Sequence, residues 1–272
     1  MLKQHLIFTD LDGTLLDHYS YSYEPAKPTL NKLRENNIDV IPTTSKTFAE
    51  VMLLRAKLSL NTPFIVENGA AVFIPKSHFS QQPNDTVEHQ DFWLKSFTPN
   101  RDYWLQVLEH KQEFKDAYIG FSQMTDEEIS LATGLSLEDA HLANARLFSE
   151  PLKWLGTEQQ KEQFKISMKS AGANVLQGGR FVHISGKSNK GVAMNWLSQL
   201  YRLAQPDLPF CNIALGDSFN DNDMLEAADI AVQIRSVKHD FPTLFRQDNV
   251  WQSKHTGPTG WAECLNQILD LK

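Results

Sequence analysis

Short apolar runs bounded by polar residues recur in the first and last thirds of the chain. Each run has the length of a β-strand, and apolar residues at helical spacing follow several of them. The expected strands cover residues 6–9, 38–42, 63–66, 70–74, 210–215 and 230–234. The expected helices run to residue 36, follow the capping box Thr47-x-x-Glu50, and cover 190–203, the stretch after 224 and 259–271. Such alternation is typical of an α/β fold with a parallel sheet.

The middle of the chain has a different pattern. Residues 75–88 are polar and contain proline, which predicts a linker. Helices are expected over 101–115 and 158–171 and after the capping residues Thr125 and Ser136, with a hairpin over 173–185 turning at Gly178-Gly179. Helices and strands segregated in this way indicate an α+β insert. We therefore expect a Rossmann-like core formed by 1–84 and 186–272, with an inserted α+β cap domain over 85–185.

Composition narrows the class of protein. The chain has 272 residues and a net charge of −7, and no run of basic residues offers a surface for nucleic acid. There is no apolar stretch of membrane-spanning length and no pattern of a secretory signal, so no membrane partner and a cytoplasmic location are expected. Two cysteines without a CxxC motif are expected to be reduced thiols.

Acidic residues follow two of the expected strands. Asp10 and Asp12 end the first apolar run, and Asp217 and Asp221 follow the run at 210–215. Carboxyl ends of parallel strands share one edge of a sheet, so these acids are predicted to meet there. Carboxylates brought together repel one another unless a cation joins them, and oxygen ligands suit Mg²⁺. Either motif alone also fits a simple turn or helix cap. An EF-hand is excluded, because Gly13 comes two positions early and Tyr21 stands where its glutamate belongs.

This chemistry predicts roles for the acids and their neighbours. One carboxylate can attack phosphorus, and a second acid two residues along can protonate the leaving oxygen and then activate water. Asp217 is expected to bind the metal, and Asp221 to hold a metal-bound water or to orient Lys190. Lys190 opens a helix at the same sheet end, where it would offset phosphate charge, with Lys187 as an alternative. The polar segment from Thr43 to Lys46 can cradle phosphate at a helix N-terminus.

The ordered motifs resemble the haloacid dehalogenase (HAD) superfamily of phosphatases, and the insert resembles the cap of its Cof-type branch. They are Asp10-x-Asp12-Gly13-Thr14, Thr44, Lys190 and Gly216-Asp217-x-x-Asn220-Asp221. The resemblance implies that Asp10 is the nucleophile and Asp12 the general acid/base, and that Thr44 and Lys190 bind the phosphoryl group. It also places Mg²⁺ on Asp10, Asp217 and the main-chain carbonyl of Asp12. Many relatives have Thr-Gly-Arg where this chain has Thr44-Ser45-Lys46, and lysine lacks the planar fork of arginine.

Further segments are similar to the mannosyl-3-phosphoglycerate phosphatase family, which dephosphorylates mannosyl-3-phosphoglycerate to mannosylglycerate. They are Thr44-Ser45-Lys46-Thr47, Glu67-Asn68-Gly69, Ala145-Arg146-x-Phe148-Ser149-Glu150-Pro151, Gly178-Gly179-Arg180-Phe181-x-His183 and Gly257-Pro258-x-Gly260-Trp261. Arg146 and Arg180 can bind a carboxylate in bidentate fashion. The full set of expected substrate-binding residues is Thr44, Ser45, Lys46, Glu67, Asn68, Arg146, Ser149, Arg180, Lys187 and Asn220.

The predicted function is therefore Mg²⁺-dependent hydrolysis of a small phosphorylated sugar or glycerate through an aspartyl-phosphate intermediate. A broader sugar-phosphate phosphatase of the sucrose-phosphate type and a phosphomutase remain alternatives. A non-catalytic protein that binds phosphorylated ligands is a third.

Overall fold

The computed structural model describes residues 3–178 and 181–271. The chain forms two compact units. The first contains residues up to 45, 60–95 and 189 onward, and the second contains 46–59 and 96–188. The predicted fold class is confirmed: a parallel sheet forms the core of the first unit, and a separate antiparallel sheet lies in the second. The expected domain boundaries after residues 84 and 185 remain a prediction.

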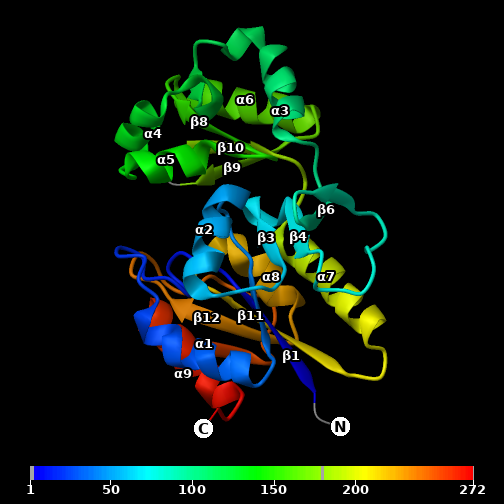
Figure 1. Cartoon of the computed structure of the whole chain (residues 1–272). Helices are drawn as coiled ribbons and strands as arrows, with labels where there is room; N and C mark the ends of the chain where they lie inside the picture. Colours follow the sequence, from blue (N-terminus) through cyan, green and yellow to red (C-terminus); the bar gives the residue numbers. More distant parts are fainter. Residues whose placement is uncertain (1–2, 179–180, 272) are drawn as a thin grey trace. The chain divides into compact units, whose positions relative to one another are not determined.

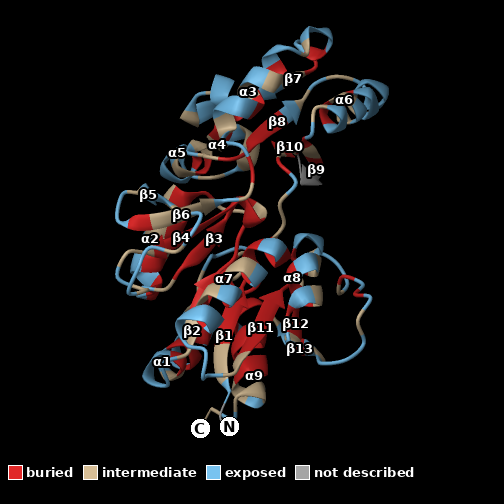
Figure 2. Cartoon of the chain, turned by 90° about the vertical axis from the view of Figure 1, so that its right-hand side faces the viewer, coloured by how far each residue is buried: buried red, intermediate tan, exposed pale blue. Residues whose placement is uncertain are grey.

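The first unit is built on a five-stranded parallel sheet in the order β13-β12-β11-β1-β2. Its strands are β1 (Gln4–Thr9), β2 (Asp39–Pro42), β11 (Phe210–Gly216), β12 (Ile230–Arg235) and β13 (Val250–Thr256). The apolar run Leu6-Ile7-Phe8 is at most 1% exposed, because helices cover both sides of these central strands (Figure 2).

Two pairs of helices pack against this sheet. α1 (Lys27–Glu35) contacts α9 (Gly257–Ile268), and α7 (Lys190–Ala204) contacts α8 (Asn222–Ala227) (Figure 1). Short 3-10 helices lie at Glu24–Ala26, Glu67–Gly69 and Phe219–Asp221. Alternation of apolar runs and helical periods predicted all four α-helices and four of the five strands. The edge strand β13 was missed, because most of its residues are exposed or half-buried and its sequence shows no apolar run.

A second sheet in the first unit corrects one prediction. β3 (Phe64–Val66), β4 (Ala71–Pro75), β5 (Val87–His89) and β6 (Phe92–Ser96) form a four-stranded sheet in the order β3-β4-β6-β5. The expected linker over 75–88 therefore leads into a hairpin. Phe92 packs its ring edge-on against Phe64, with 5.5 Å between ring centroids, and this tertiary contact gave no periodic signal in the sequence.

The second unit contains a four-stranded antiparallel sheet in the order β7-β8-β10-β9. Its strands are β7 (Tyr118–Gly120), β8 (Glu150–Trp154), β9 (Asn174–Gly178) and β10 (Phe181–Ser185). Its helices are α2 (Phe48–Leu58), α3 (Arg101–Glu109), α4 (Asp126–Thr133), α5 (Leu137–Asn144) and α6 (Glu158–Ser170), with 3-10 turns at Gln112–Phe114 and Phe121–Gln123. The capping residues Thr47, Thr125 and Ser136 begin their helices as predicted.

A buried ion pair connects three elements of this unit. Glu150, which is fully buried, accepts a hydrogen bond of 2.6 Å from Arg101 Nε and bonds of 2.8 Å from the main chain and hydroxyl of Ser122. Arg101 also donates to Asn144, whose main-chain oxygen lies 2.7 Å from Nη1. The fork of Arg101 therefore joins the start of α3 to the end of α5 and to β8.

Within the parts of the chain that the structure describes, none of the helices combines the length and hydrophobicity needed to cross a bilayer. Cys211 and Cys264 are buried free thiols, as expected.

Candidate active site

The two acidic motifs meet where β1 and β11 end. These strands are parallel neighbours, with Thr9 opposite Leu215. The main-chain N–H of Asp10 donates to the Leu215 oxygen at 2.9 Å, so the first residue after each strand stands at the same sheet edge. This confirms the prediction that carboxylates two hundred residues apart in sequence come together.

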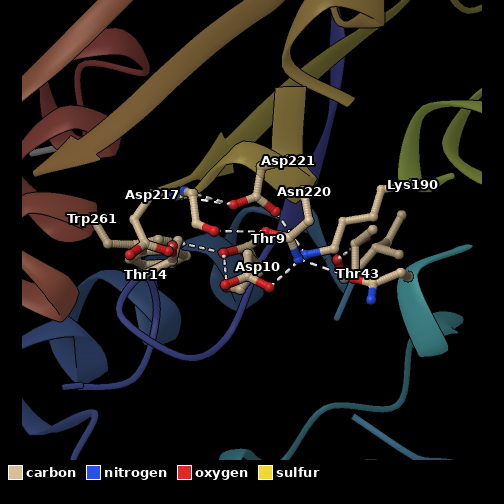
Figure 3. A network of polar contacts seen from close by, with 12 residues as sticks. Thr9, Asp10, Thr14, Thr43, Lys190, Asp217, Asn220, Asp221 and Trp261 are labelled. Carbon is tan, nitrogen blue, oxygen red and sulfur yellow. Dashed lines mark hydrogen bonds and ion pairs between the residues drawn. The ribbon is translucent and has the colours of Figure 1, made fainter. Parts of the chain in front are cut away.

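Three buried carboxylates and one buried lysine form the centre of the site (Figure 3). Carboxylate oxygens of Asp10, Asp217 and Asp221 all lie within 4.8 Å of one another. Lys190, the first residue of α7, is fully buried and places Nζ 2.6 Å from Asp10 Oδ1 and 2.6 Å from Asp221 Oδ1. Lys187 is exposed and belongs to the second unit. The assignment of Lys190 as the phosphate-binding lysine remains a prediction.

Asp221 fixes both the lysine and its own loop. Its Oδ1 accepts from Lys190, while Oδ2 accepts from the main-chain N–H groups of Asp217 at 3.1 Å and Ser218 at 3.0 Å. Both oxygens of Asp221 therefore already have partners. This geometry matches the expected role of orienting Lys190.

The electrostatics of this cluster favour a bound cation. Burial and the negative charges of Asp10 and Asp221 raise the pKa of Asp217 to about 7. Burial also raises the pKa of Asp221, although Lys190 opposes the rise. For Lys190 burial acts to lower the pKa, but the two carboxylates raise it above its usual value, so the ammonium stays charged. One ammonium cannot balance three carboxylates, and a purely carboxylate donor set fits a hard divalent cation.

Gly13 and Thr14 of the first motif pack against the side chain of Asp217. Gly13 has a φ of +82°, and a Cβ at this position would lie 2.7 Å from Asp217 Oδ2. Thr14 Oγ1 donates to Asp217 Oδ1 at 3.3 Å. The glycine therefore supplies both a left-handed backbone and room for the carboxylate.

Asp12 lines a cavity of about 210 Å³ together with Asp10 and Ser45. Its carboxylate is not one of the three that cluster among the described residues. The expected part of Asp12 in metal binding thus depends on its main-chain carbonyl, as the resemblance implies.

The segment after β2 lies beside β1. Thr43 N donates to the Thr9 oxygen at 2.7 Å, and the buried Thr44 receives a main-chain bond of 2.9 Å from Asn68. Lys46 belongs to the second unit, where its Nζ lies 3.6 Å from Glu50. Lys46 is the residue found where many relatives have arginine, and here it forms an ion pair with Glu50.

The Glu67–Gly69 turn packs against the start of α7. Gly69 has a φ of +87°, and a Cβ there would lie 2.1 Å from the main-chain oxygen of Asn189, next to Lys190. Asn68 accepts a hydrogen bond of 2.9 Å from Asn220 Nδ2. The turn therefore joins the helix that carries Lys190 to the loop that carries Asp221.

Arg146 and Ser149, two further predicted substrate residues, lie in the second unit. Arg146 Nη1 donates to the buried Ser149 hydroxyl at 3.0 Å. Arg180 lies outside the described residues. The substrate roles of these residues remain predictions.

Several residues at or near the acid cluster had no assigned role at the sequence level. Trp261 is fully buried and donates from Nε1 to Thr9 Oγ1 at 3.0 Å, and that hydroxyl donates to the main-chain oxygen of Asp10 at 2.7 Å. Ser236 acts to lower the pKa of Asp217 and lines the same cavity. The one signal in the sequence was Trp261, which belongs to a motif of the resemblance.

The fold and the site together define a class of protein: an α/β protein with a parallel sheet that carries clustered acids and a buried lysine at its carboxyl edge. A family model described as haloacid dehalogenase-like hydrolase matches residues 7–240, and the chain belongs to this family. Similar proteins include the glucosyl-3-phosphoglycerate/mannosyl-3-phosphoglycerate phosphatase of Methanococcoides burtonii, 38% identical over 98% of this chain and 97% of that protein. The protein of the same description from Persephonella marina is 35% identical over 97% of each chain.

Solved structures share the fold. A HAD-superfamily phosphatase of Bacteroides thetaiotaomicron has a TM-score of 0.67 at 16% identity, over 98% of this chain and 95% of that one. The sucrose-phosphatase of Synechocystis has a TM-score of 0.62 at 13% identity, over 98% of each chain. The family and the full-length relatives identify this chain as a phosphatase.

Proposed function

We propose that the chain is a Mg²⁺-dependent phosphatase that hydrolyses mannosyl- or glucosyl-3-phosphoglycerate through a phosphorylated Asp10. The observation that carries the proposal is the cluster of Asp10, Asp217 and Asp221, with oxygens within 4.8 Å and Lys190 bridging two of them. The substrate assignment is supported by phosphatases of that description, which match this chain over nearly their full length.

The acid cluster fits Mg²⁺ by the chemistry of its donors. Asp10 and Asp217 would hold the ion directly, together with the main-chain carbonyl of Asp12. Because both oxygens of Asp221 already accept hydrogen bonds, this residue would reach the ion through water. When bound, the ion supplies positive charge that offsets the negative charge of the phosphoryl oxygens.

The reaction takes two displacements. A carboxylate oxygen of Asp10 attacks phosphorus, the bond from phosphorus to the ester oxygen breaks, and Asp12 protonates that oxygen as it leaves. Asp12 then removes a proton from water as the water attacks the phosphorus of phospho-Asp10, which releases inorganic phosphate and restores both carboxyl groups. Lys190 holds Asp10 in place and offsets charge on the phosphoryl group, with Thr44 as a further phosphoryl contact.

Phosphate release across a substrate panel tests this proposal. The panel contains mannosyl- and glucosyl-3-phosphoglycerate, sucrose 6-phosphate and p-nitrophenyl phosphate, each with Mg²⁺ or with EDTA. We expect the two hexosyl phosphoglycerates to be hydrolysed with the highest kcat/KM, and EDTA to abolish activity. Equal or better hydrolysis of sucrose 6-phosphate would overturn the substrate assignment. Transfer of phosphate to a sugar without its release would indicate a phosphomutase.

Asp10→Asn tests the nucleophile. This variant should lose turnover while keeping the circular dichroism spectrum of the parent. Asp207→Asn, at an exposed aspartate in the turn before β11, is the matched control and should remain fully active. Substantial hydrolysis by the Asp10→Asn protein would end the assignment.

A further inference from the structure

Three side chains that can carry positive charge share the cavity with the catalytic acids. The cavity of about 210 Å³ beside Asp10 and Asp12 is also lined by His18, Lys238 and His239. They come from two loops, one after β1 and one between β12 and β13. No catalytic or metal-binding role in the proposed reaction uses them. They are basic residues beside an acid cluster, in a chain whose net charge is −7.

Lys238 is the group in this cavity with charge available for a ligand. Among residues 3–178 and 181–271, no carboxylate lies within ion-pair distance of its Nζ, whereas Lys190 is fully engaged by Asp10 and Asp221. Beside Lys238, His18 is half-buried and interacts electrostatically with it and with Asp12. Burial and Lys238 lower the pKa of His18, although Asp12 and Asp17 oppose this, so His18 offers a neutral N–H donor near pH 7.

His239 is tied to its own loop. Its Nδ1 lies 2.9 Å from the Asp240 oxygen, and its ring lies 5.8 Å from that of Phe219 between centroids. Its Nδ1 is therefore already engaged, which leaves His18 and Lys238 as the other two basic side chains of the cavity.

The covalent structure of a 3-phosphoglycerate ester places a second anion close to Asp12. Three bonds separate the ester oxygen from the carboxylate carbon, so the two atoms lie within about 4 Å of each other. In the proposed reaction Asp12 protonates that ester oxygen. A carboxylate at this distance reaches the cavity that Asp12 lines, where His18 and Lys238 are basic side chains. Ser45, Ser218, Asn220 and Ser236 also line this cavity and are neutral.

We infer that His18 and Lys238 form a carboxylate subsite, which selects phosphomonoesters bearing a carboxylate three bonds from the ester oxygen. This inference rests on the proposed function and deepens it, because it assigns recognition of the acid moiety to the catalytic unit itself. Lys238 supplies a charge-assisted hydrogen bond, and His18 a second donor beside the general acid.

Two substrates that differ in this one group provide the test. 3-Phosphoglycerate and glycerol 3-phosphate share the ester, but only the first carries the carboxylate. The ratio of their kcat/KM values with Mg²⁺ measures the preference. Lys238→Met should lower this ratio about 10-fold or more, as expected for loss of one charge-assisted hydrogen bond, and His18→Gln should lower it to a smaller extent. Lys254→Met, at an exposed lysine of β13 that does not line the cavity, is the matched control and should leave the ratio unchanged.

The outcomes separate the inference from the function on which it rests. A parent enzyme that hydrolyses p-nitrophenyl phosphate while Lys238→Met and His18→Gln both keep the parental ratio would overturn the subsite and leave the phosphatase intact. A parent enzyme that releases no phosphate from these esters or from mannosyl- and glucosyl-3-phosphoglycerate would overturn the proposed function.

Discussion

Asp217 is buried beside two other carboxylates, which predicts an unusual pH dependence of the free energy of unfolding when no metal is bound. The folded state raises the pKa of Asp217 from 3.8 to about 7 through burial and through its neighbours Asp10 and Asp221. The folded protein therefore binds a proton at Asp217 more tightly than the unfolded chain does. The corresponding stabilisation is present at low pH and is lost as pH rises through about 7.

The size of the effect follows from these two pKa values. Preferential protonation of Asp217 contributes about 2.7 kcal/mol to the free energy of unfolding at pH 5 and about 0.2 kcal/mol at pH 7.5. The Asp217→Asn variant cannot take up this proton. Its stability relative to the parent should therefore improve by about 2.5 kcal/mol between pH 5 and pH 7.5 in EDTA.

Urea unfolding of both proteins at the two pH values, followed by circular dichroism, measures this difference. The difference between parent and variant cancels the titration of groups distant from the cluster. Adding Mg²⁺ at pH 7.5 should stabilise the parent and not the variant, because the ion binds the ionised carboxylates. A stability difference in EDTA that is the same at both pH values would refute the claim that Asp217 is buried among uncompensated negative charges.

Two further substitutions test how the site and the second unit are built. Gly13→Ala should raise the Mg²⁺ concentration needed for half-maximal activity, because its Cβ would lie 2.7 Å from Asp217 Oδ2; Gly134→Ala, with a similar φ of +84° and no atom within 4 Å, should not. Glu150→Ala leaves Arg101 without its buried partner and should lower the free energy of unfolding by about 3–5 kcal/mol, measured by urea unfolding, while Glu158→Ala, at an exposed ion pair, should change it little. An unaltered Mg²⁺ requirement in Gly13→Ala, or equal stability of the two glutamate variants, would contradict the respective argument.

The sequence predicted the centre of the site because local signals and topology agreed there. The runs before Asp10 and Asp217 are apolar on both faces, as strands buried between two helical layers must be. Parallel strands then carry their terminal residues to a common edge. Lys190 was predicted at the same edge because it begins a helix directly after an apolar strand.

Other features depend on tertiary contacts that leave no local pattern. β13 is largely exposed, and β5 and β6 are short strands anchored by Phe92, so neither gives an alternating sequence. His18 and Lys238 lie in irregular loops far apart in the sequence, and only the folded chain places them in one cavity. The hydrogen bonds that both Asp221 oxygens accept likewise depend on the position of Lys190 and of the loop backbone, which the sequence alone does not give.

The central claim is that Asp10 carries the phosphoryl group during turnover. The most direct test is rapid acid quenching of the enzyme during turnover of mannosyl-3-phosphoglycerate with Mg²⁺, followed by peptide mass spectrometry. We expect a phosphoryl group on the peptide that contains Asp10, and its absence from that peptide in Asp10→Asn. A phosphoryl group on another residue, or burst release of phosphate with no covalent adduct at Asp10, would contradict it.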